Sequence, residues 1–391
     1  MLAAVQTHPI QYHAPVYRAL EQRWGVPVTA IYGSDFSVAG YRDREFGATF
    51  SWDTDLLSGY SSVFLARTEN GGGRCFEDVK ATGLAAVLTR LQPSAVLIGG
   101  YSPHFHRAAF FEAWRAGSAI LFRAETTDVE PGSPLRRSVR RTALRTLYGR
   151  ASRLLYIGER SKRHYEQLGC EASRLVFSPY CVDGSAFEAD EDARARLREH
   201  ARTALRVSPE HLVVLFSGKL ILKKRPDLLL AAVGDLARTL HRPLTVVFLG
   251  DGDLRAALEA ESRALHTVRA EFLGFKNQRE LSPYYHAADV MVLPSQHSET
   301  WGLVVNEALM HGVPCVVSSA VGCGDDLIVP GRTGEVFEVG SRDSLVAALT
   351  RVGDLVGRID IRDACRAQVA RYSVDRAACG IAQAYRSVVG A

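Results

Sequence analysis

Short apolar runs recur along the chain, and between most of them apolar residues recur every three or four positions. The runs, each with the length of a buried strand, cover 2–5, 26–31, 95–98, 119–122, 154–157, 212–216, 244–249, 290–293 and 315–317. The helical spacing is clearest at 107–116, 227–240 and 303–311. Strands that are apolar on both faces and alternate with helices are typical of parallel sheets. The pattern therefore predicts an α/β protein with two such sheets, one in each half of the chain.

One change of composition divides the chain nearly in half. Residues 178–184 form a stretch with proline and glycine, and a highly charged helical stretch follows at 188–206. The 391 residues, 47% of them apolar, are also too many for one ordinary core. We expect a first domain over 1–180, a second over 181–370, and a closing helix over 371–391, where apolar residues again have helical spacing.

Composition excludes several classes of function. The 47 basic and 43 acidic side chains give a net charge of +4, which is too small to hold a nucleic-acid duplex, so nucleic acid is not an expected partner. The seven cysteines are scattered without a C-x-x-C pair, which argues against disulfides or zinc and favours a reducing compartment. The first residues do not resemble a signal peptide, and no segment approaches the ~20 apolar residues that span a bilayer. We therefore expect a soluble, cytoplasmic protein.

Lysine is rare in this chain, and three of its six lysines lie in one short loop. Lys219, Lys223 and Lys224 follow the apolar run at 212–216. A basic loop at the carboxyl end of a strand could neutralise a diphosphate without a metal ion. A solvated basic turn is the alternative, but the scarcity of lysine elsewhere favours a functional loop.

Two carboxylates flank the start of a predicted helix. Glu299 lies on a polar loop, the helix begins near Gly302 or Leu303, and Glu307 follows ~7 Å further along the helix axis. The unpaired N–H groups of the helix start suit a phosphate, and carboxylates accept hydrogen bonds from hydroxyls. This combination describes a nucleotide sugar. The alternative, which the spacing leaves open, is that Glu299 caps the helix and Glu307 is solvated.

With these motifs in place, residues from about 212 to 350 resemble the donor-binding domain of the retaining glycosyltransferases of the GT4 type. The resemblance runs through Gly218, Lys219 and Lys224, the glycine turn at 250–252, residues 272–275, 287–289 and 312–317, and the E-x7-E pair Glu299 and Glu307. It implies the GT-B fold, in which two Rossmann-like domains face a cleft and the C-terminal helix closes back on the N-terminal domain. It also implies transfer of a hexosyl or related group from a nucleotide diphosphate sugar to an acceptor hydroxyl, with retention and without a metal or other cofactor.

The resemblance assigns roles to individual residues. Lys219 and Lys224 hold the diphosphate, Glu307 the ribose, and Glu299 the sugar hydroxyls near the reacting carbon. The other implied donor contacts are Gly218, Gly250, Phe275, Lys276, Thr300, Trp301, Gly302 and Leu303. Lys219 stands where the family usually has arginine, which removes a bidentate donor but keeps the charge. Since no residue is an obvious covalent nucleophile, we expect front-face attack, with the leaving phosphate taking the acceptor's proton.

The N-terminal half resembles the acceptor-binding domains of the same group more faintly. Acceptor candidates follow the predicted strands, whose carboxyl ends are the usual ligand edge of an open sheet: His8, His13, Tyr101, Arg123 and Glu125. Members of the group often carry a histidine in the loop where this chain has Arg123 and Glu125. A turn or capping role is the alternative for the histidines. The implied acceptor is a glycan, a lipid-linked sugar or a small-molecule glycoside.

The segment 135–155 carries seven arginines and no acid. Its apolar residues keep helical spacing at 135, 139, 143, 147, 151 and 154, so the segment predicts a basic amphipathic helix. Such a helix could rest on anionic lipid, which would place the protein peripherally at the inner membrane face. We favour a surface helix packed on its own sheet, because the apolar stripe has only the width that a core requires.

Rival functions remain. The triplets Asp53-Thr54-Asp55 and Asp251-Gly252-Asp253 are compatible with a metal-dependent GT-A transferase, but such triplets are frequent by chance and we expect no metal. A nucleotide-sugar epimerase shares the two-domain architecture, and a non-catalytic nucleotide-sugar-binding protein is the other alternative. An oxidoreductase is disfavoured because no G-x-G-x-x-G follows an early strand.

Overall fold

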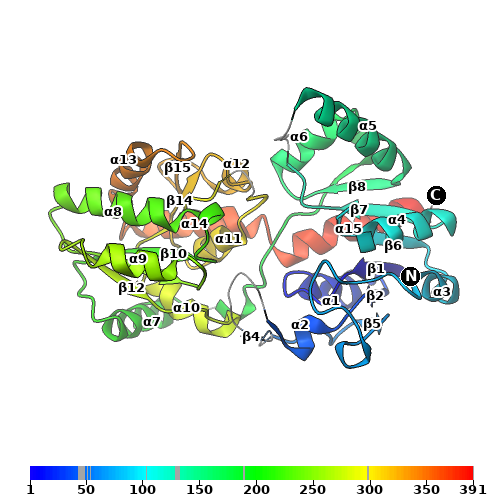
Figure 1. Cartoon of the computed structure of the whole chain (residues 1–391), viewed down its shortest axis with the longest axis horizontal. Helices are drawn as coiled ribbons and strands as arrows, with labels where there is room; N and C mark the ends of the chain where they lie inside the picture. Colours follow the sequence, from blue (N-terminus) through cyan, green and yellow to red (C-terminus); the bar gives the residue numbers. More distant parts are fainter. Residues whose placement is uncertain are drawn as a thin grey trace. The chain divides into compact units, whose positions relative to one another are not determined.

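The computed structural model describes residues 1–42, 49–50, 52, 54–102, 104–127, 133–187, 190–296 and 299–390. The chain forms two compact units, each with its own parallel sheet (Figure 1). The first unit comprises Met1–Tyr41, Phe50–Asp183 and Tyr372–Ala391, and the second comprises Arg42–Thr49 and Gly184–Arg371. The chain thus leaves the first unit after Asp183 and re-enters it at Tyr372, beside the sequence-based boundaries of 180 and 371.

The first unit is built on a seven-stranded parallel sheet of order β5-β2-β1-β6-β7-β8-β9. Its strands are β1 (Leu2–Gln6), β2 (Val28–Tyr32), β5 (Ser61–Phe64), β6 (Ala95–Ile98), β7 (Ala119–Arg123), β8 (Arg153–Tyr156) and β9 (Leu175–Phe177). Its helices are α1 (Ala14–Gln22), α2 (Phe36–Ala39), α3 (Leu84–Leu91), α4 (His104–Arg115), α5 (Pro134–Arg150), α6 (Glu159–Gln167) and α15 (Val374–Val389). A separate two-stranded sheet pairs β3 (Tyr41–Arg42) with β4 (Thr49–Phe50).

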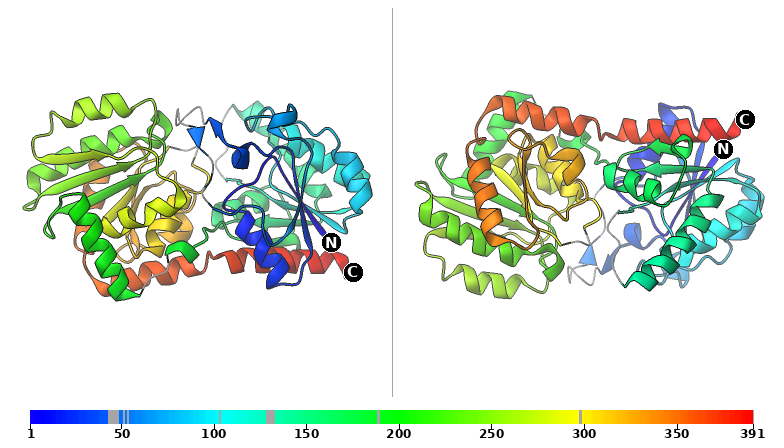
Figure 2. Two further views of the ribbon diagram at one scale, coloured as in Figure 1. Left: turned by 90° about the horizontal axis from the view of Figure 1, so that it is seen from below. Right: turned by 90° about the horizontal axis from the view of Figure 1, so that it is seen from above.

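Helices cover both faces of this sheet. Ala3 and Val5 of β1 belong to a core cluster with α3, α4, α5 and α6, whereas Leu2 and Ala4 belong to a second cluster with α1 and α15. Because successive side chains of a strand point to opposite faces, burial on both sides explains the continuous apolar run of β1. Figure 2 shows α15, in red, beside α1, in blue. At Gly380 of α15 a Cβ atom would lie 2.0 Å from the carbonyl oxygen of Phe177, so glycine permits this close packing on β9.

The second unit is built on a six-stranded parallel sheet of order β12-β11-β10-β13-β14-β15. Its strands are β10 (Leu212–Ser217), β11 (Leu244–Leu249), β12 (Val268–Phe272), β13 (Val290–Leu293), β14 (Cys315–Ser318) and β15 (Gly334–Phe337). Its helices are α7 (Glu191–Ala204), α8 (Pro226–Thr239), α9 (Arg255–Ser262), α10 (Gln278–Ala287), α11 (Leu303–Met310), α12 (Gly324–Leu327), α13 (Arg342–Gly353) and α14 (Ile359–Ala370). Helix α7 packs on α10, α11 packs on α14, and α8 contacts α9 and α13.

All nine strands predicted from apolar runs are confirmed, and so is the α/β class. The four strands that the runs did not predict in these two sheets are the sheet edges, β5, β9, β12 and β15. The side chains of β5, β9 and β12 are largely half-buried or exposed, although three of the four residues of β15 are buried. Every residue of β1, β10, β11, β13 and β14 is buried. An edge strand is covered on fewer sides, so its sequence needs no continuous apolar run.

Helix α5 corrects the prediction for the segment 135–155. It ends at Arg150, and the first half of the predicted apolar stripe does not face a core, because Leu135 is 76% exposed and Val139 is 64% exposed. Leu144 and Tyr148 are the buried side chains instead. None of the described helices combines the length and the apolarity that a bilayer-crossing segment needs.

Candidate functional site

The loops of the E-x7-E and lysine motifs leave the same edge of the second unit's sheet. The strand order reverses between β10 and β13, and ligands of open parallel sheets bind beyond the carboxyl ends of the strands at such a point. Gly218 follows β10 and Gly250 follows β11, with φ of +148° and +142°. A Cβ atom on Gly250 would lie 1.9 Å from the carbonyl oxygen of Gly218, so only glycine fits there.

Lys224 and Glu299 form an ion pair at this edge. Lys224 ends the 3-10 helix η4 (Leu222–Lys224), and the same carboxylate oxygen of Glu299 accepts a hydrogen bond from Ser295 Oγ at 3.0 Å. The backbone N–H of Gln296 donates to the carbonyl oxygen of Lys223 at 2.9 Å, which ties the two loops together. The side chains of the pair are only 20% and 14% exposed, so their attraction is little screened by water. Two of the three catalytic candidates are therefore in direct contact.

Lys219, the third candidate, belongs to the same loop directly after Gly218. Its carbonyl oxygen accepts the backbone N–H of Ile221 at 3.0 Å, so the loop turns tightly after the lysine. The structure therefore places the backbone of Lys219 and the Lys224–Glu299 pair at one edge of the sheet.

Glu307 is buried inside α11, and the solvated position considered for it is wrong. Its side chain is 2% exposed, and one carboxylate oxygen accepts a hydrogen bond from Tyr285 Oη at 2.7 Å. Burial raises the pKa of Glu307 to about 7, although hydrogen bonds from Tyr285 and Gln278 act in the opposite direction. A carboxyl group that titrates near neutrality can respond to a ligand that donates hydrogen bonds to it.

The start of α11 is shaped by its backbone. Gly302 occupies the N-cap position with φ of +101°, so Glu299, three residues earlier, is not the N-cap residue of α11. A Cβ atom at Gly302 would lie 2.8 Å from Leu293 Cδ2, and Trp301 is buried, with its indole N–H donating to Asn306 Oδ1 at 2.9 Å. Thr300 is half-buried, and Leu303 is the first helical residue. The buried side chains of Leu293, Trp301 and Asn306 thus fix the turn at Gly302.

Phe275 and Lys276 lie beyond β12, at the edge of the sheet and two strands from β10. Both are half-buried, and Lys276 pairs with Glu280 at 3.7 Å. They share the carboxyl-end side of the sheet with the lysine loop.

The D-x-D triplets have structural partners. One carboxylate oxygen of Asp251 binds Arg255 at 2.7 Å and the other accepts the N–H of Gly252 at 2.9 Å, while Asp55 accepts the N–H groups of Leu57 and Ser58. Asp53 lies outside the described residues. Within the described ranges no group of three or more His, Cys, Asp and Glu side chains is placed to hold a metal ion.

The two candidate histidines, His8 and His13, follow β1 and are neutral at pH 7. Burial lowers the pKa of His8 to about 4, and burial followed by the charge of Arg123 lowers the pKa of His13 to about 3. His8 Nδ1 lies 2.8 Å from Thr7 Oγ1, and the ring of His13 stacks on Tyr180 with centroids 6.3 Å apart. His13 is the N-cap residue of α1, but its side chain makes no cap hydrogen bond.

Arg123 is the last residue of β7, Glu125 follows that strand, and Tyr101 follows β6. Arg123 is 8% exposed and donates to the carbonyl oxygens of Ser178 and Pro179 at 3.1 and 2.6 Å, so it fastens the end of β7 to the segment after β9. Its guanidinium lies 5.0 Å from the ring centre of Tyr180, whose hydroxyl donates to Glu125. Tyr101 Oη accepts a hydrogen bond from Arg140 at 3.0 Å.

The sequence did not indicate three residues that shape these sites. Tyr285 and Ser295 contact Glu307 and Glu299, and Tyr180 links Arg123 with His13 and Glu125. Ser295 adjoins the motif and could have been found from its position. The two tyrosines come from distant segments, and only the fold brings them to their partners.

The comparison with family models matches residues 198–355 to glycosyl transferases group 1. D-inositol 3-phosphate glycosyltransferase from Rhodococcus erythropolis is 30% identical over 48% of this chain and 44% of its own length. Sulfoquinovosyl transferase SQD2 from Arabidopsis thaliana is 32% identical over 49% of this chain and 36% of its own. The chain thus spans less than half the length of these two curated relatives.

Solved structures match over nearly the whole chain. Sucrose-phosphate synthase from Thermosynechococcus elongatus has a TM-score of 0.72 at 17% identity and covers 100% of this chain and 99% of its own. Anabaena HepE in complex with UDP and glucose has a TM-score of 0.68 at 16% identity, covering 98% of each chain. At such identity the likeness shows the fold alone. Residues 198–355 therefore resemble glycosyl transferases group 1, and the whole chain shares the GT-B fold of these solved structures.

Proposed function

We propose that the protein is a retaining glycosyltransferase that transfers a sugar from a nucleotide diphosphate sugar to an acceptor hydroxyl without a metal ion. The observation that carries the proposal is the Lys224–Glu299 ion pair at the strand-order reversal, close in sequence to the buried Glu307 and inside the stretch that matches the family. The names of the relatives, which are glycosyltransferases, and the UDP and glucose bound by HepE support it.

In this mechanism the lysine loop receives the negative charge that develops on the leaving diphosphate. Lys224 exchanges its partner Glu299 for a phosphate oxygen, and Lys219 contributes a second positive charge from the same loop. Glu299, released from the lysine, accepts hydrogen bonds from the sugar hydroxyls and stabilises the positive charge that develops on the sugar ring. The ion pair therefore keeps both groups in position before the donor binds.

Glu307 is assigned to the ribose. A ribose hydroxyl would donate to the carboxylate, as Tyr285 Oη does, and would favour its ionised form. The nucleobase is assigned to Phe275 and Lys276. Backbone groups of Thr300–Leu303, exposed by the turn at Gly302, would line the sugar and the phosphates.

We assign the acceptor to the first unit. His8 and His13 are neutral at pH 7, so they would exchange hydrogen bonds with acceptor hydroxyls rather than supply charge. Arg123 acts by holding the segment that carries Tyr180, and Glu125 and Tyr101 complete the candidate surface. The acceptor class is a sugar-containing or lipid-linked molecule.

A lipid-linked acceptor agrees with the surface of α5. Leu135 and Val139 are exposed beside Arg136 and Arg137, and the exposed Trp114 of α4 lies 5.3 Å from the guanidinium of Arg150. Exposed apolar side chains flanked by arginines suit the interface of an anionic membrane. We therefore assign the protein to the cytoplasm, with peripheral contact at the inner membrane face.

The test compares two double variants with equal loss of charge. Lys219→Ala with Lys224→Ala should weaken binding of UDP or another donor nucleotide about 10- to 100-fold per lysine, as expected for lost hydrogen bonds to a charged group. Lys80→Ala with Lys162→Ala is the control and should bind normally. Calorimetry gives the affinity, and nucleotide release with and without an acceptor separates a transferase from an epimerase. Unchanged binding by the first variant would contradict the donor assignment.

A further inference from the structure

A cavity of about 660 Å³ lies in the second unit on the side of the sheet opposite the lysine loop. It is lined by residues that immediately precede three strands: Val207 and Pro209 before β10, Asp289 before β13, and Pro314 before β14. The amino ends of parallel strands lie at the edge opposite their carboxyl ends. The cavity is therefore separate from the candidate donor site.

Six arginines line this cavity, against two acidic side chains, Glu199 and Asp289. Three belong to α7 and three to the start and first turns of α14: Arg194, Arg198, Arg202, Arg358, Arg362 and Arg366. In each set the arginines are four residues apart, which places them on one face of a helix. Two basic helix faces thus border one cavity, and the lining has an excess of positive charge.

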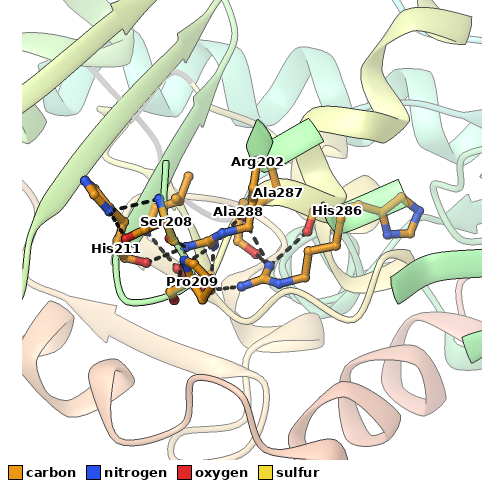
Figure 3. Close-up of polar contacts among 10 residues, drawn as sticks. Arg202, Ser208, Pro209, His211, His286, Ala287 and Ala288 are labelled. Atoms are coloured by element: carbon orange, nitrogen blue, oxygen red, sulfur yellow. Dashed lines mark hydrogen bonds and ion pairs between the residues drawn. The ribbon is translucent and has the colours of Figure 1, made fainter. Parts of the chain in front are cut away.

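Two of these arginines have a structural role. Arg198 donates to the carbonyl oxygens of His286, Ala287 and Ala288 at 2.9, 3.2 and 2.9 Å, and Arg202 donates to those of Ser208 and His211 at 2.9 and 2.7 Å. Both also bind Asp289. Figure 3 shows the two sides of this clamp, with Ser208, Pro209 and His211 on one side and His286–Ala288 on the other. The clamp fixes α7 at the amino edge of the sheet.

Three other arginines share a single carboxylate. Arg194, Arg362 and Arg366 lie 3.0, 3.6 and 2.6 Å from the carboxylate oxygens of Glu191, and Arg366 also lies 3.4 Å from Asp363. Nε of each of these arginines and Nη2 of Arg366 are buried without a hydrogen-bond partner. Burying an unsatisfied donor is unfavourable, and more so for a charged group. The cluster thus has more donors than the described protein acceptors use.

His286 adds a further unpaired group. It lines the cavity, is 6% exposed, and its Nε2 atom has no hydrogen-bond partner. Burial, followed by the charges of Arg194, Arg366 and Arg198, lowers the pKa of His286 to about 4. The ring is therefore neutral at pH 7, mainly because it is buried and in addition because arginines surround it.

We propose that this cavity binds a small phosphorylated organic molecule. Guanidinium groups match phosphate oxygens in pairs, and the donors of Arg194, Arg362 and Arg366 are the ones left over. The buried apolar side chains of Val207, Val313, Leu355 and Ile361 line the same cavity and would contact the organic part. The volume lies within the range of small-molecule sites, about 300 to 1,000 Å³.

The binding experiment uses the full chain with Lys219→Ala and Lys224→Ala, so that the candidate donor site does not contribute. Glucose 6-phosphate, glycerol 3-phosphate and AMP are titrated by calorimetry. Glucose, which lacks the phosphate, and inorganic phosphate, which lacks the organic part, are titrated as controls. At least one phosphate ester should bind at one site, about tenfold or more tighter than inorganic phosphate. Failure of all three esters, or equal affinity for inorganic phosphate, would overturn the proposal.

Three variants locate the site. Arg362→Gln with Arg366→Gln should reduce ester binding about tenfold or more, whereas the charge-matched control Arg136→Gln with Arg137→Gln, on exposed positions of α5, should not. Glu191→Gln should tighten binding about tenfold, because it removes the carboxylate that competes for three guanidinium groups. If the cluster of Arg194, Arg362, Arg366 and Glu191 only holds the two helices together, Glu191→Gln should not tighten ester binding.

Two further measurements distinguish this cavity from the donor site and from a lipid-binding surface. With Lys219 and Lys224 intact, the Arg362/Arg366 variant should still bind donor nucleotide, so a failed donor assignment and a failed second site give different results. Vesicles of phosphatidylcholine with phosphatidic acid test a lipid source of the phosphate. Vesicle binding that depends on Arg362 and Arg366 would overturn the assignment to a soluble molecule.

Discussion

Replacing Glu307 by glutamine tests whether the buried, ionised carboxylate of Glu307 lowers the stability of the folded protein. Burial raises its pKa from 4.5 to about 7, so between these values the folded protein binds the proton more tightly than the unfolded chain does. Stability therefore falls as the pH rises through this window, and the full cost is present above pH ~7. The shift corresponds to about 3 kcal/mol, since each pKa unit is worth about 1.4 kcal/mol.

Glu307→Gln keeps the size of the side chain and an oxygen that can accept from Tyr285, but it cannot ionise. The glutamine variant should therefore gain stability relative to the original chain as the pH is raised from about 4.5 to about 8. In a unit of this size 1 kcal/mol corresponds to roughly 2–4 °C, so the difference in Tm should change by about 6–12 °C in favour of the variant. Thermal unfolding of both proteins across the pH range measures it, and other titrating groups cancel in the comparison.

Glu261→Gln is the matched control, because it makes the same substitution at an exposed position of α9. Its difference from the original chain should stay constant over the same range. If the Glu307→Gln difference is also constant, or changes in the opposite direction, the argument that burial dominates the titration of Glu307 is wrong. The proposed ribose contact adds a second readout: nucleotide should bind the original chain more tightly above pH ~7 than below it, and the glutamine variant should lose that dependence.

Three further predictions concern the loops, the surface and the first unit. Gly250→Ala should lower the Tm of the second unit and abolish nucleotide binding, because the added Cβ would meet the carbonyl oxygen of Gly218; Gly149→Ala, with open space around it in α5, should be neutral or stabilising. Leu135→Ser with Val139→Ser should reduce co-sedimentation with anionic vesicles and leave nucleotide affinity unchanged; equal sedimentation would contradict the membrane assignment. Arg123→Met should destabilise the first unit by about 3–5 kcal/mol in denaturant unfolding, since it leaves the carbonyl oxygens of Ser178 and Pro179 without their donor. An Arg123→Met variant as stable as the original chain would contradict that role.

The central strands could be predicted from the sequence because burial on both faces leaves a continuous signal. Every residue of β10 and β11 is buried, and both appear as apolar runs. The edge strand β12 begins with a buried valine and continues with half-buried residues that include Arg269 and Glu271, which pair with each other. A strand of this composition is indistinguishable from a polar loop until its neighbour in the sheet is known.

The candidate donor site shows the same division between local and distant information. Glu299, Gly302 and Glu307 lie within nine residues of one another, so their spacing alone placed two carboxylates around a helix start. The burial of Glu307 depends on α10, and neither the distance to Tyr285 nor the raised pKa follows from the motif. Whether a motif glutamate is solvated or buried is decided by the helix packed over it.

The arginine cavity lay beyond sequence analysis for a related reason. The charged segment 188–206 indicated only a domain boundary, because an isolated, highly charged helix is usually solvated. In the folded protein, Arg194 of this segment shares the carboxylate of Glu191 with Arg362 and Arg366 of α14. Helix α14 lies more than 150 residues later in the chain, so the sequence alone does not reveal this cluster. Like charges four residues apart on each helix, and again across the gap between helices, repel one another. A fold that gathers these charges around a cavity with so few carboxylates is best stabilised by an anion that enters it, and this is why Glu191→Gln and Arg362→Gln with Arg366→Gln should change ligand affinity in opposite directions.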